Sequence, residues 1–258
     1  MAAISDHSKL LSKPRTFWAL WILGLAGVFS LLLVPLTLPT GVELPVSGST
    51  LKGLSLLQPI VLLTAMAGLG AALASQVGLE VPLLQAIYEQ RGIGKVARSQ
   101  LLVASIATLT VFIAMMLVQG WAEPHLPAAY LAINENAETL LPPVTRFLYG
   151  GITEEILMRW GLMTLLVWLP WKFLQSGTSR PKPIFFWGAI LTTALLFGIG
   201  HLPLLFNLVP QASSFLVTYI VGLNALVGVA AGWLYWKHGL EAAIMAHILF
   251  HVLGLIVQ

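Results

Sequence analysis

Between Phe147 and Trp171 the chain reads FLYGGITEEILMRWGLMTLLVWLPW, an apolar stretch that carries three charged side chains. A helix that crosses a membrane needs about 20 mostly apolar residues, so this stretch is long enough to cross one. An ionised group near the middle of a bilayer costs about 2.5–3.5 kcal/mol even on permissive insertion scales. Glu154, Glu155 and Arg159 therefore need partners inside a helical bundle, or a function that requires them.

The composition of the whole chain indicates a membrane protein. Of its 258 residues, 58% are hydrophobic and only 9% are charged, whereas ordinary soluble domains carry about 25% charged residues. A soluble domain of this size could not cover its surface with 13 basic and 10 acidic side chains. The composition excludes a soluble globular protein, a disordered chain and a free nucleic-acid-binding protein. The absence of cysteine excludes disulfides, thiolate nucleophiles and Cys-based metal sites.

Six further stretches have the length and apolar character of membrane spans, and none alternates apolar and polar residues as barrel strands do. The predicted spans are Phe17–Leu38, Leu54–Val77, Leu101–Val118, Phe147–Trp171, Phe185–Phe206, Phe215–Trp236 and Leu240–Val257. The predicted fold is all-α, a polytopic membrane bundle of about seven (or eight) transmembrane helices around a polar intramembrane cavity. We expect residues 1–258 to form a single multi-pass membrane domain.

Basic residues are concentrated in alternate connections between the spans. Ten of them precede the first span or lie in every second loop, whereas the other loops hold only Lys52 and Arg146. By the positive-inside rule this distribution predicts a cytoplasmic N-terminus and an external C-terminus, most simply in the plasma membrane. We expect Gly78–Gln100 to hold an interfacial amphipathic helix and Gly120–Thr145 to be an exposed outer loop.

Helical geometry separates the three charges of the fourth span. Glu155 and Arg159 are four residues apart with the acid first, which is the favourable order for an ion pair on an α-helix. Glu154 is rotated by about 100° from Glu155 and has no basic partner in its own helix. This carboxylate therefore needs a partner from another helix, or a chemical role.

Three histidines in two later spans are the candidate partners. The fifth span ends in Phe197-Gly198-Ile199-Gly200-His201, where both glycines are expected to let another backbone approach the histidine. His247 and His251 are four residues apart in the last span, so their rings lie on one helix face. The three histidines and Glu154 are expected to form a shared polar site, in which Glu154, His201 and His247 converge in a cavity that opens toward the outer half of the membrane.

The chemistry of this residue set leaves three functions open. A carboxylate and an imidazole that share a water form a general base, and further imidazoles can donate hydrogen bonds to an oxyanion. Such a set hydrolyses amides without a covalent intermediate. One Glu and three His could instead hold zinc in a metal-dependent hydrolase, although no H-E-x-x-H helix is present. Intramembrane Glu, Arg and His also suit a proton or ion pathway, or a non-enzymatic scaffold.

The order of the motifs resembles that of one known family. Glu154-Glu155-x-x-x-Arg159, Phe197-x-x-x-His201 and His247-x-x-x-His251 look like the motif series of the CAAX-prenyl-protease and bacteriocin-processing family (CPBP, or Abi). Its members are multi-pass intramembrane proteases, similar to the Ras-converting CAAX protease. The resemblance covers about Tyr149–Val252. The third motif of the family usually ends in Asn or Asp, whereas this chain has His251, which can also donate a hydrogen bond to an oxyanion.

The resemblance implies a glutamic intramembrane endopeptidase, a hydrolase of peptide bonds. Glu154 and His201 would activate the attacking water, and His247 would help to stabilise the oxyanion. Glu155 and Arg159 would support the site. The implied enzyme needs no cofactor, acts on a peptide or membrane-protein substrate in the lipid bilayer and binds no nucleic acid.

Overall fold

The computed structural model describes residues 12–35, 47–135 and 141–257, and every regular element within these ranges is a helix. In chain order the elements are α1 (Lys13–Ser30), η2 (Leu31–Leu33), α2 (Gly48–Ser55), α3 (Leu57–Val77), α4 (Pro82–Glu89), α5 (Ile93–Ala122), η3 (Glu123–His125), α6 (Ala128–Glu135), α8 (Pro143–Thr145), η4 (Arg146–Glu154), η5 (Ile156–Met163), α9 (Thr164–Leu174), α10 (Pro183–Gly200), α11 (Leu202–Leu208), α12 (Ser214–His238) and α13 (Leu240–Val257). The all-α prediction is confirmed for the described part of the chain.

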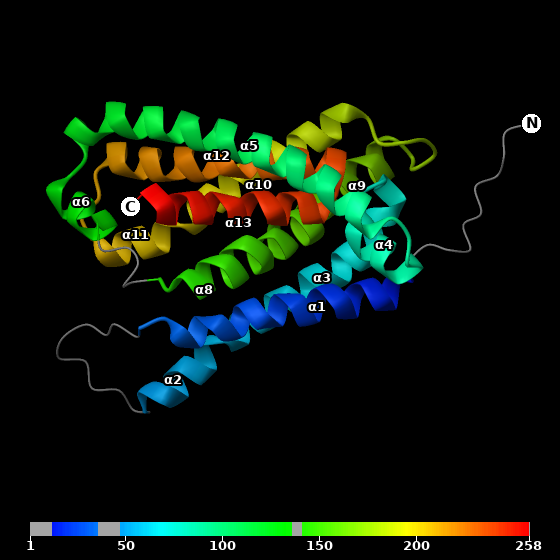
Figure 1. Cartoon of the computed structure of the whole chain (residues 1–258), viewed down its shortest axis with the longest axis horizontal. Coiled ribbons are helices and arrows are strands. Elements are labelled where there is room, and N and C mark those ends of the chain that lie inside the picture. The colour runs from blue at the N-terminus through cyan, green and yellow to red at the C-terminus, as the bar shows by residue number, and fades with distance from the viewer. Residues whose placement is uncertain (1–11, 36–46, 136–140, 258) are drawn as a thin grey trace, which may run out of the picture.

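Within the described ranges, six helical segments are long and apolar enough to cross a membrane. They are Lys13–Leu33, Gly48–Val77, Ile93–His125, Pro183–Leu208, Ser214–His238 and Leu240–Val257. The chain is therefore a multi-pass membrane protein. Figure 1 shows α1 beginning at one end of the bundle and α13 finishing at the other.

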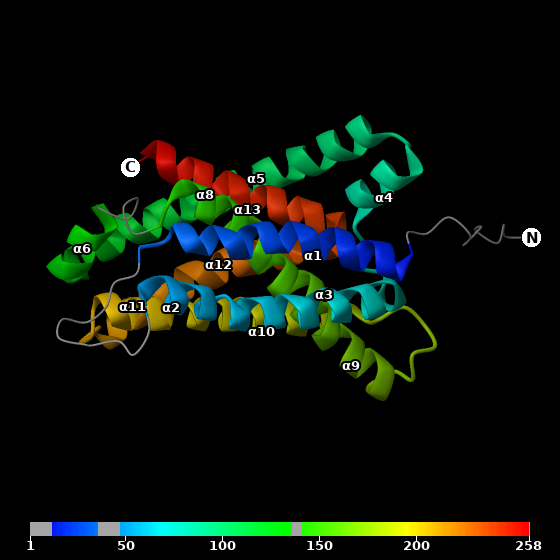
Figure 2. The same cartoon turned by 90° about the horizontal axis from the view of Figure 1, so that it is seen from below.

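The fourth expected span, Phe147–Trp171, is helical but is not one regular α-helix. It follows α8 directly and consists of most of η4, then η5 and most of α9, and η4 and η5 are π-helical. Seven spans were predicted, and this segment, which also carries charged residues, is not among the six long apolar ones. Its π-helical part packs against α1, α3, α10, α12 and α13. Figures 1 and 2 show it running through the middle of the bundle, which removes its charged residues from lipid.

Glycines allow the helices around this central segment to pack closely. A Cβ atom at Gly228 on α12 would lie 2.8 Å from the Cα of Ala194 on α10. One turn further along α12, a Cβ at Gly232 would lie 3.0 Å from the side chain of Ile190. Since real Cβ atoms do not approach neighbours this closely, larger residues here would separate α10 from α12.

Both long connections differ from simple loops. Gly78–Gln100 contains the short helix α4, as expected, and a carboxylate oxygen of Glu241 accepts a hydrogen bond from the amide of Leu84 near the start of that helix. The stretch Gly120–Thr145, expected to be an exposed loop, is partly helical, because it includes η3 and α6, and its residues 136–140 lie outside the described ranges. Glu123, Pro124 and His125 are exposed, whereas Leu126 is buried against residues of α11 and α12, so hydrophobic burial helps to order the connection.

The outer faces of the bundle are apolar. On α5 the exposed large side chains follow a helical spacing, and they are Leu102, Ile106, Leu109, Ile113 and Leu117. A continuous apolar face of this kind has no partner in the described chain and suits contact with lipid.

Candidate active site

The central helix widens where the charged motif lies. Side-chain hydroxyls mark this widening: Thr153 donates to the carbonyl of Leu148 (3.3 Å), and Thr164 donates to that of Arg159 (3.3 Å), each five residues back. Thr153 also donates to the carbonyl of Gly24 on α1 at 2.8 Å. The α-helical geometry assumed for this motif is therefore wrong locally. π-helical turns are rare and often occur at functional sites.

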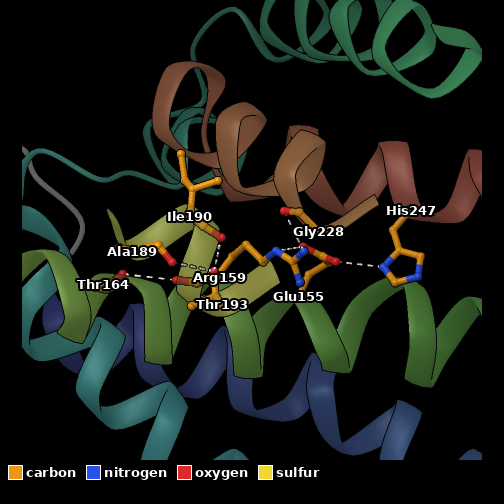
Figure 3. Close-up of polar contacts among 8 residues, drawn as sticks. All are labelled: Glu155, Arg159, Thr164, Ala189, Ile190, Thr193, Gly228 and His247. Carbon is orange, nitrogen blue, oxygen red and sulfur yellow. Dashed lines mark hydrogen bonds and ion pairs between the residues drawn. The ribbon is translucent and has the colours of Figure 1, made fainter. Parts of the chain in front are cut away.

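Glu155 and Arg159 form the buried centre of the site. Both side chains are 0% exposed, and the Arg159 Nε lies 3.2 Å from the Glu155 Oε2. Nη2 of Arg159 donates to the carbonyl of Gly228 on α12 at 3.1 Å, and the guanidinium lies 5.1 Å from the ring centre of Phe197. Figure 3 shows the arginine reaching from the central helix toward α10 and α12. The central helix, α10 and α12 therefore all contact this ion pair.

His247 extends this network toward α13. Its Nδ1 lies 2.7 Å from the Glu155 Oε1, so one carboxylate is shared between an arginine and a histidine (Figure 3). His251 stacks on His247 with ring centres 4.9 Å apart. The His251 Nε2 is buried without a hydrogen-bond partner among the described residues, against the backbone at Gly150, where a Cβ would lie 2.8 Å from it. Gly150 thus makes room for the second histidine.

His201 lies where α10 ends and α11 begins. Its Nδ1 lies 2.8 Å from the carbonyl oxygen of Phe197, one turn back along α10. Because a carbonyl only accepts, Nδ1 carries the proton, which leaves the Nε2 lone pair free in the neutral ring. The Phe197 ring packs edge-on against both His201 (4.8 Å) and His247 (5.9 Å). One phenylalanine therefore orients two histidines from different helices.

A cavity of about 130 Å³ joins these groups. Among the predicted site residues, Glu154, His201, His247 and His251 line it, whereas Glu155 and Arg159 lie behind its wall. The volume is enough for about four waters, taking about 30 Å³ for each. Glu154 is partly exposed to the cavity, and no described residue forms a hydrogen bond or ion pair with it. Its carboxylate is available to a water or a substrate.

Further polar residues of the cavity were not identified from the sequence. Asn224 of α12, Tyr149 and Arg146 all contribute to the lining. Arg146 had been counted as a loop charge, but it is buried at the start of η4 and its Nε donates to the carbonyl of Leu141 at 3.0 Å. Arg146 immediately precedes the fourth predicted span, and this position was the one feature of the sequence that could have indicated its burial in the bundle.

One predicted glycine contact is present and the other is not. A Cβ at Gly198 would lie 2.5 Å from the carbonyl oxygen of Val221 on α12, so the backbones meet there as expected. Gly200 has no neighbouring atom within 4 Å of such a Cβ, so that expectation is wrong. The close approach therefore involves the helix face one turn before His201.

The side chains offer no ready metal site. Within the described ranges, no group of three or more His, Asp or Glu side chains is arranged to hold a metal ion. One nitrogen of His247 is already committed to Glu155, and one nitrogen of His251 is directed at Gly150. The observed geometry does not favour the zinc arrangement of one Glu and three His.

Comparison with known proteins gives one match. The family model described as type II CAAX prenyl endopeptidase Rce1-like matches residues 136–253. None of the curated proteins and none of the solved structures matches the chain. The matched segment contains all six predicted site residues, from Glu154 to His251. Residues 136–253, a little under half of the chain, are therefore similar to the Rce1-like type II CAAX prenyl endopeptidase family, which is a family of peptidases.

Proposed function

We propose that this protein is an intramembrane endopeptidase that hydrolyses peptide bonds with a water activated by Glu154 and His201. The observation that carries the proposal is the shared cavity, in which the Glu154 carboxylate, with no hydrogen-bond or ion-pair partner among the described residues, is joined by histidines from two other helices. The family match supports the class of reaction. Residues 1–258 act as one membrane domain in this proposal, with η4 and η5 forming part of a seventh crossing.

Water activation follows from the hydrogen bond that fixes His201. With Nδ1 donating to Phe197, Nε2 of the neutral ring accepts a proton from a water in the cavity. Glu154 accepts a second hydrogen bond from the same water and orients it toward the scissile carbonyl carbon. After the attack, the proton taken from water is delivered to the departing amine, so the carboxylate and the imidazole return to their starting states.

In this proposal, His247 stabilises the oxyanion. Its Nδ1–H donates to Glu155, so Nε2 can donate to the oxyanion only when the ring is doubly protonated. The Glu155 carboxylate stabilises that cation, and Arg159 holds the carboxylate in place. His251 supports His247 by stacking. Glu155 and Arg159 therefore act by positioning and charge, without contact with the substrate.

The cavity is lined by His201, which precedes α11, and by His251 near the end of α13. Figure 1 shows α11 and the end of α13 in the same half of the bundle. If the basic loops are cytoplasmic, this half faces the outside, and the most suitable location is the plasma membrane. The substrate is then a peptide or membrane protein whose scissile bond reaches the outer leaflet. CAAX-type substrates are the class that the family name implies.

The decisive experiment compares wild type with Glu154→Gln and with Glu241→Gln as a matched control. Glu241 is a partly buried carboxylate on α13 that does not line the cavity. The purified proteins are incubated with a diverse pool of prenylated and plain peptides, and the fragments are identified by mass spectrometry. We expect fragments from wild type and the control but not from Glu154→Gln. Full activity in Glu154→Gln, with the protein folded, overturns the proposal.

A further inference from the structure

Two close contacts between α10 and α12 determine where one amide side chain points. Gly198 meets the backbone at Val221, and Gly228 meets the backbone at Ala194. Asn224 lies three residues after Val221 and four residues before Gly228. On an α-helix this spacing places all three residues on one face. Asn224 therefore lies on the face of α12 that is turned toward α10 and the central helix, between two points where larger side chains would not fit.

The side chain of Asn224 enters the cavity with one free N–H. Its Nδ2 lies 2.8 Å from the carbonyl oxygen of Ile220, and because a carbonyl only accepts, the nitrogen must be the atom that faces it. An amide nitrogen has two hydrogens, so one remains available. The residue lines the same cavity as Glu154, His201 and His247. It is thus an uncharged donor, held by its own helix, beside the proposed site of attack.

The histidines alone supply a limited set of donors. One nitrogen of His247 is committed to Glu155, so its other nitrogen donates only in the doubly protonated ring. One nitrogen of His251 is buried against the backbone at Gly150. Oxyanion sites stabilise the charge with preorganised donors, and asparagine amides are among them. Unlike an imidazole, an amide N–H is a donor at every pH in the working range.

We propose that Asn224 is a catalytic residue whose free amide N–H donates to the oxyanion of the tetrahedral intermediate. The inference rests on the proposed peptidase function. Water adds to the scissile carbonyl carbon, its proton passes to the Glu154 and His201 pair, and the π electrons of the carbonyl move onto oxygen. That oxygen accepts hydrogen bonds from Asn224 and His247. The C–N bond then breaks as the intermediate collapses, and the leaving nitrogen takes the proton.

The test replaces Asn224 by Leu, which is similar in size but has no donor, with Asn207→Leu on the exposed side of α11 as the control. Both are assayed on a peptide that wild type cleaves. Loss of one oxyanion donor is expected to lower kcat by about 10²–10³-fold while KM stays within about threefold. A kcat within threefold of wild type overturns the inference, and so does a rise in KM without a fall in kcat.

A second readout separates catalysis from structure. In a thioamide substrate, sulfur replaces the oxygen at the scissile carbonyl and accepts hydrogen bonds poorly. Wild type should therefore discriminate against the thioamide more strongly than Asn224→Leu does, whereas equal discrimination overturns the inference. If the leucine variant does not fold, Asn224→Ala decides, since it removes the amide and with it the donor. Its kcat must also fall, and retention of wild-type kcat overturns the proposal.

The two proposals fail in different ways. If wild type cleaves and Glu154→Gln does not, the peptidase function stands and the Asn224 variants decide this inference alone. If Glu154→Gln cleaves as well as wild type, the proposed mechanism fails at water activation, before the oxyanion is considered.

Discussion

Replacing Glu155 by Gln is expected to leave a buried guanidinium without its anion. Arg159 is fully buried, and Glu155 is the carboxylate paired with it at 3.2 Å. Removing one partner of a buried ion pair costs about 3–5 kcal/mol, because the remaining charge stays desolvated. Arg159 keeps its hydrogen bond to the carbonyl of Gly228, and a glutamine oxygen can still accept. We therefore expect the free energy of unfolding to fall by the lower end of this range, about 3 kcal/mol.

Thermal unfolding in detergent measures this loss. For a chain of this length, about 1 kcal/mol shifts Tm by about 2–4 °C, so Glu155→Gln should unfold about 6–12 °C below wild type. Cleavage should fall by about 10²-fold or more, because the carboxylate that stabilises protonated His247 is gone. The matched control is Glu241→Gln. The Glu241 carboxylate accepts a hydrogen bond from the amide of Leu84 near the start of α4 and lies outside the cavity.

A second substitution tests the physical cause. If the loss comes from an unpaired charge, Glu155→Gln combined with Arg159→Met should be more stable than Glu155→Gln alone, since the charge has been removed. The coupling energy in this double-mutant cycle should be about 1–3 kcal/mol. Activity should stay low in the double variant, because His247 still lacks its carboxylate. Additive losses of stability, with no coupling, would refute the reasoning.

Three further expectations follow from the geometry. Gly150→Ala should destabilise the protein by about 1–3 kcal/mol through overpacking against His251, and a smaller residue at 251 should restore part of the Tm; no recovery would mean that the clash lies elsewhere. Because the chain contains no cysteine, single cysteines at Thr178 and His125 can be labelled in sealed vesicles, and only the second should react from outside; the opposite pattern would reverse the proposed orientation. Peptidase activity should persist in excess chelator, as expected for water activation by Glu154 and His201; loss that zinc restores would favour the metal-dependent alternative.

The spans could be predicted because lipid imposes a simple requirement on length and polarity. The prediction for the last span, Leu240–Val257, coincides with α13 residue for residue. The π-helical form of Arg146–Glu154 and Ile156–Met163 could not be predicted in the same way. Packing against other helices favours the π-helical form; for example, the Thr153 hydroxyl donates a hydrogen bond to the carbonyl of Gly24 on α1. The local pattern of apolar residues does not reveal such a contact between distant parts of the chain.

The candidate site residues that are most costly to place in lipid were the easiest to predict from the sequence. Glu154 and His201 stood out because polar groups are rare in apolar spans, and the structure brings both to one cavity. The bond between His247 and Glu155 was not foreseen, since it depends on how α13 crosses the central helix. Asn224 was missed because a single uncharged amide in an apolar helix is a weak signal. Only the glycine contacts on either side of it show where it points.

Neighbouring carboxylates in this site have opposite surroundings, and the roles proposed for them rest on this difference. Glu155 lies between Arg159 and His247: its Oε2 forms an ion pair with the guanidinium, and its Oε1 accepts a hydrogen bond from the imidazole. Glu154 borders the cavity with no such partner in the described chain, so it can accept a hydrogen bond from water. Pairs of titratable groups with divergent environments are typical of acid–base catalysis. Glu154 ends the π-helical segment η4, and Glu155 lies between η4 and η5. Glu155 contacts residues of the central helix and α13, whereas Glu154 borders the cavity, so the proposed structural anion and the proposed reactive one occupy adjacent positions.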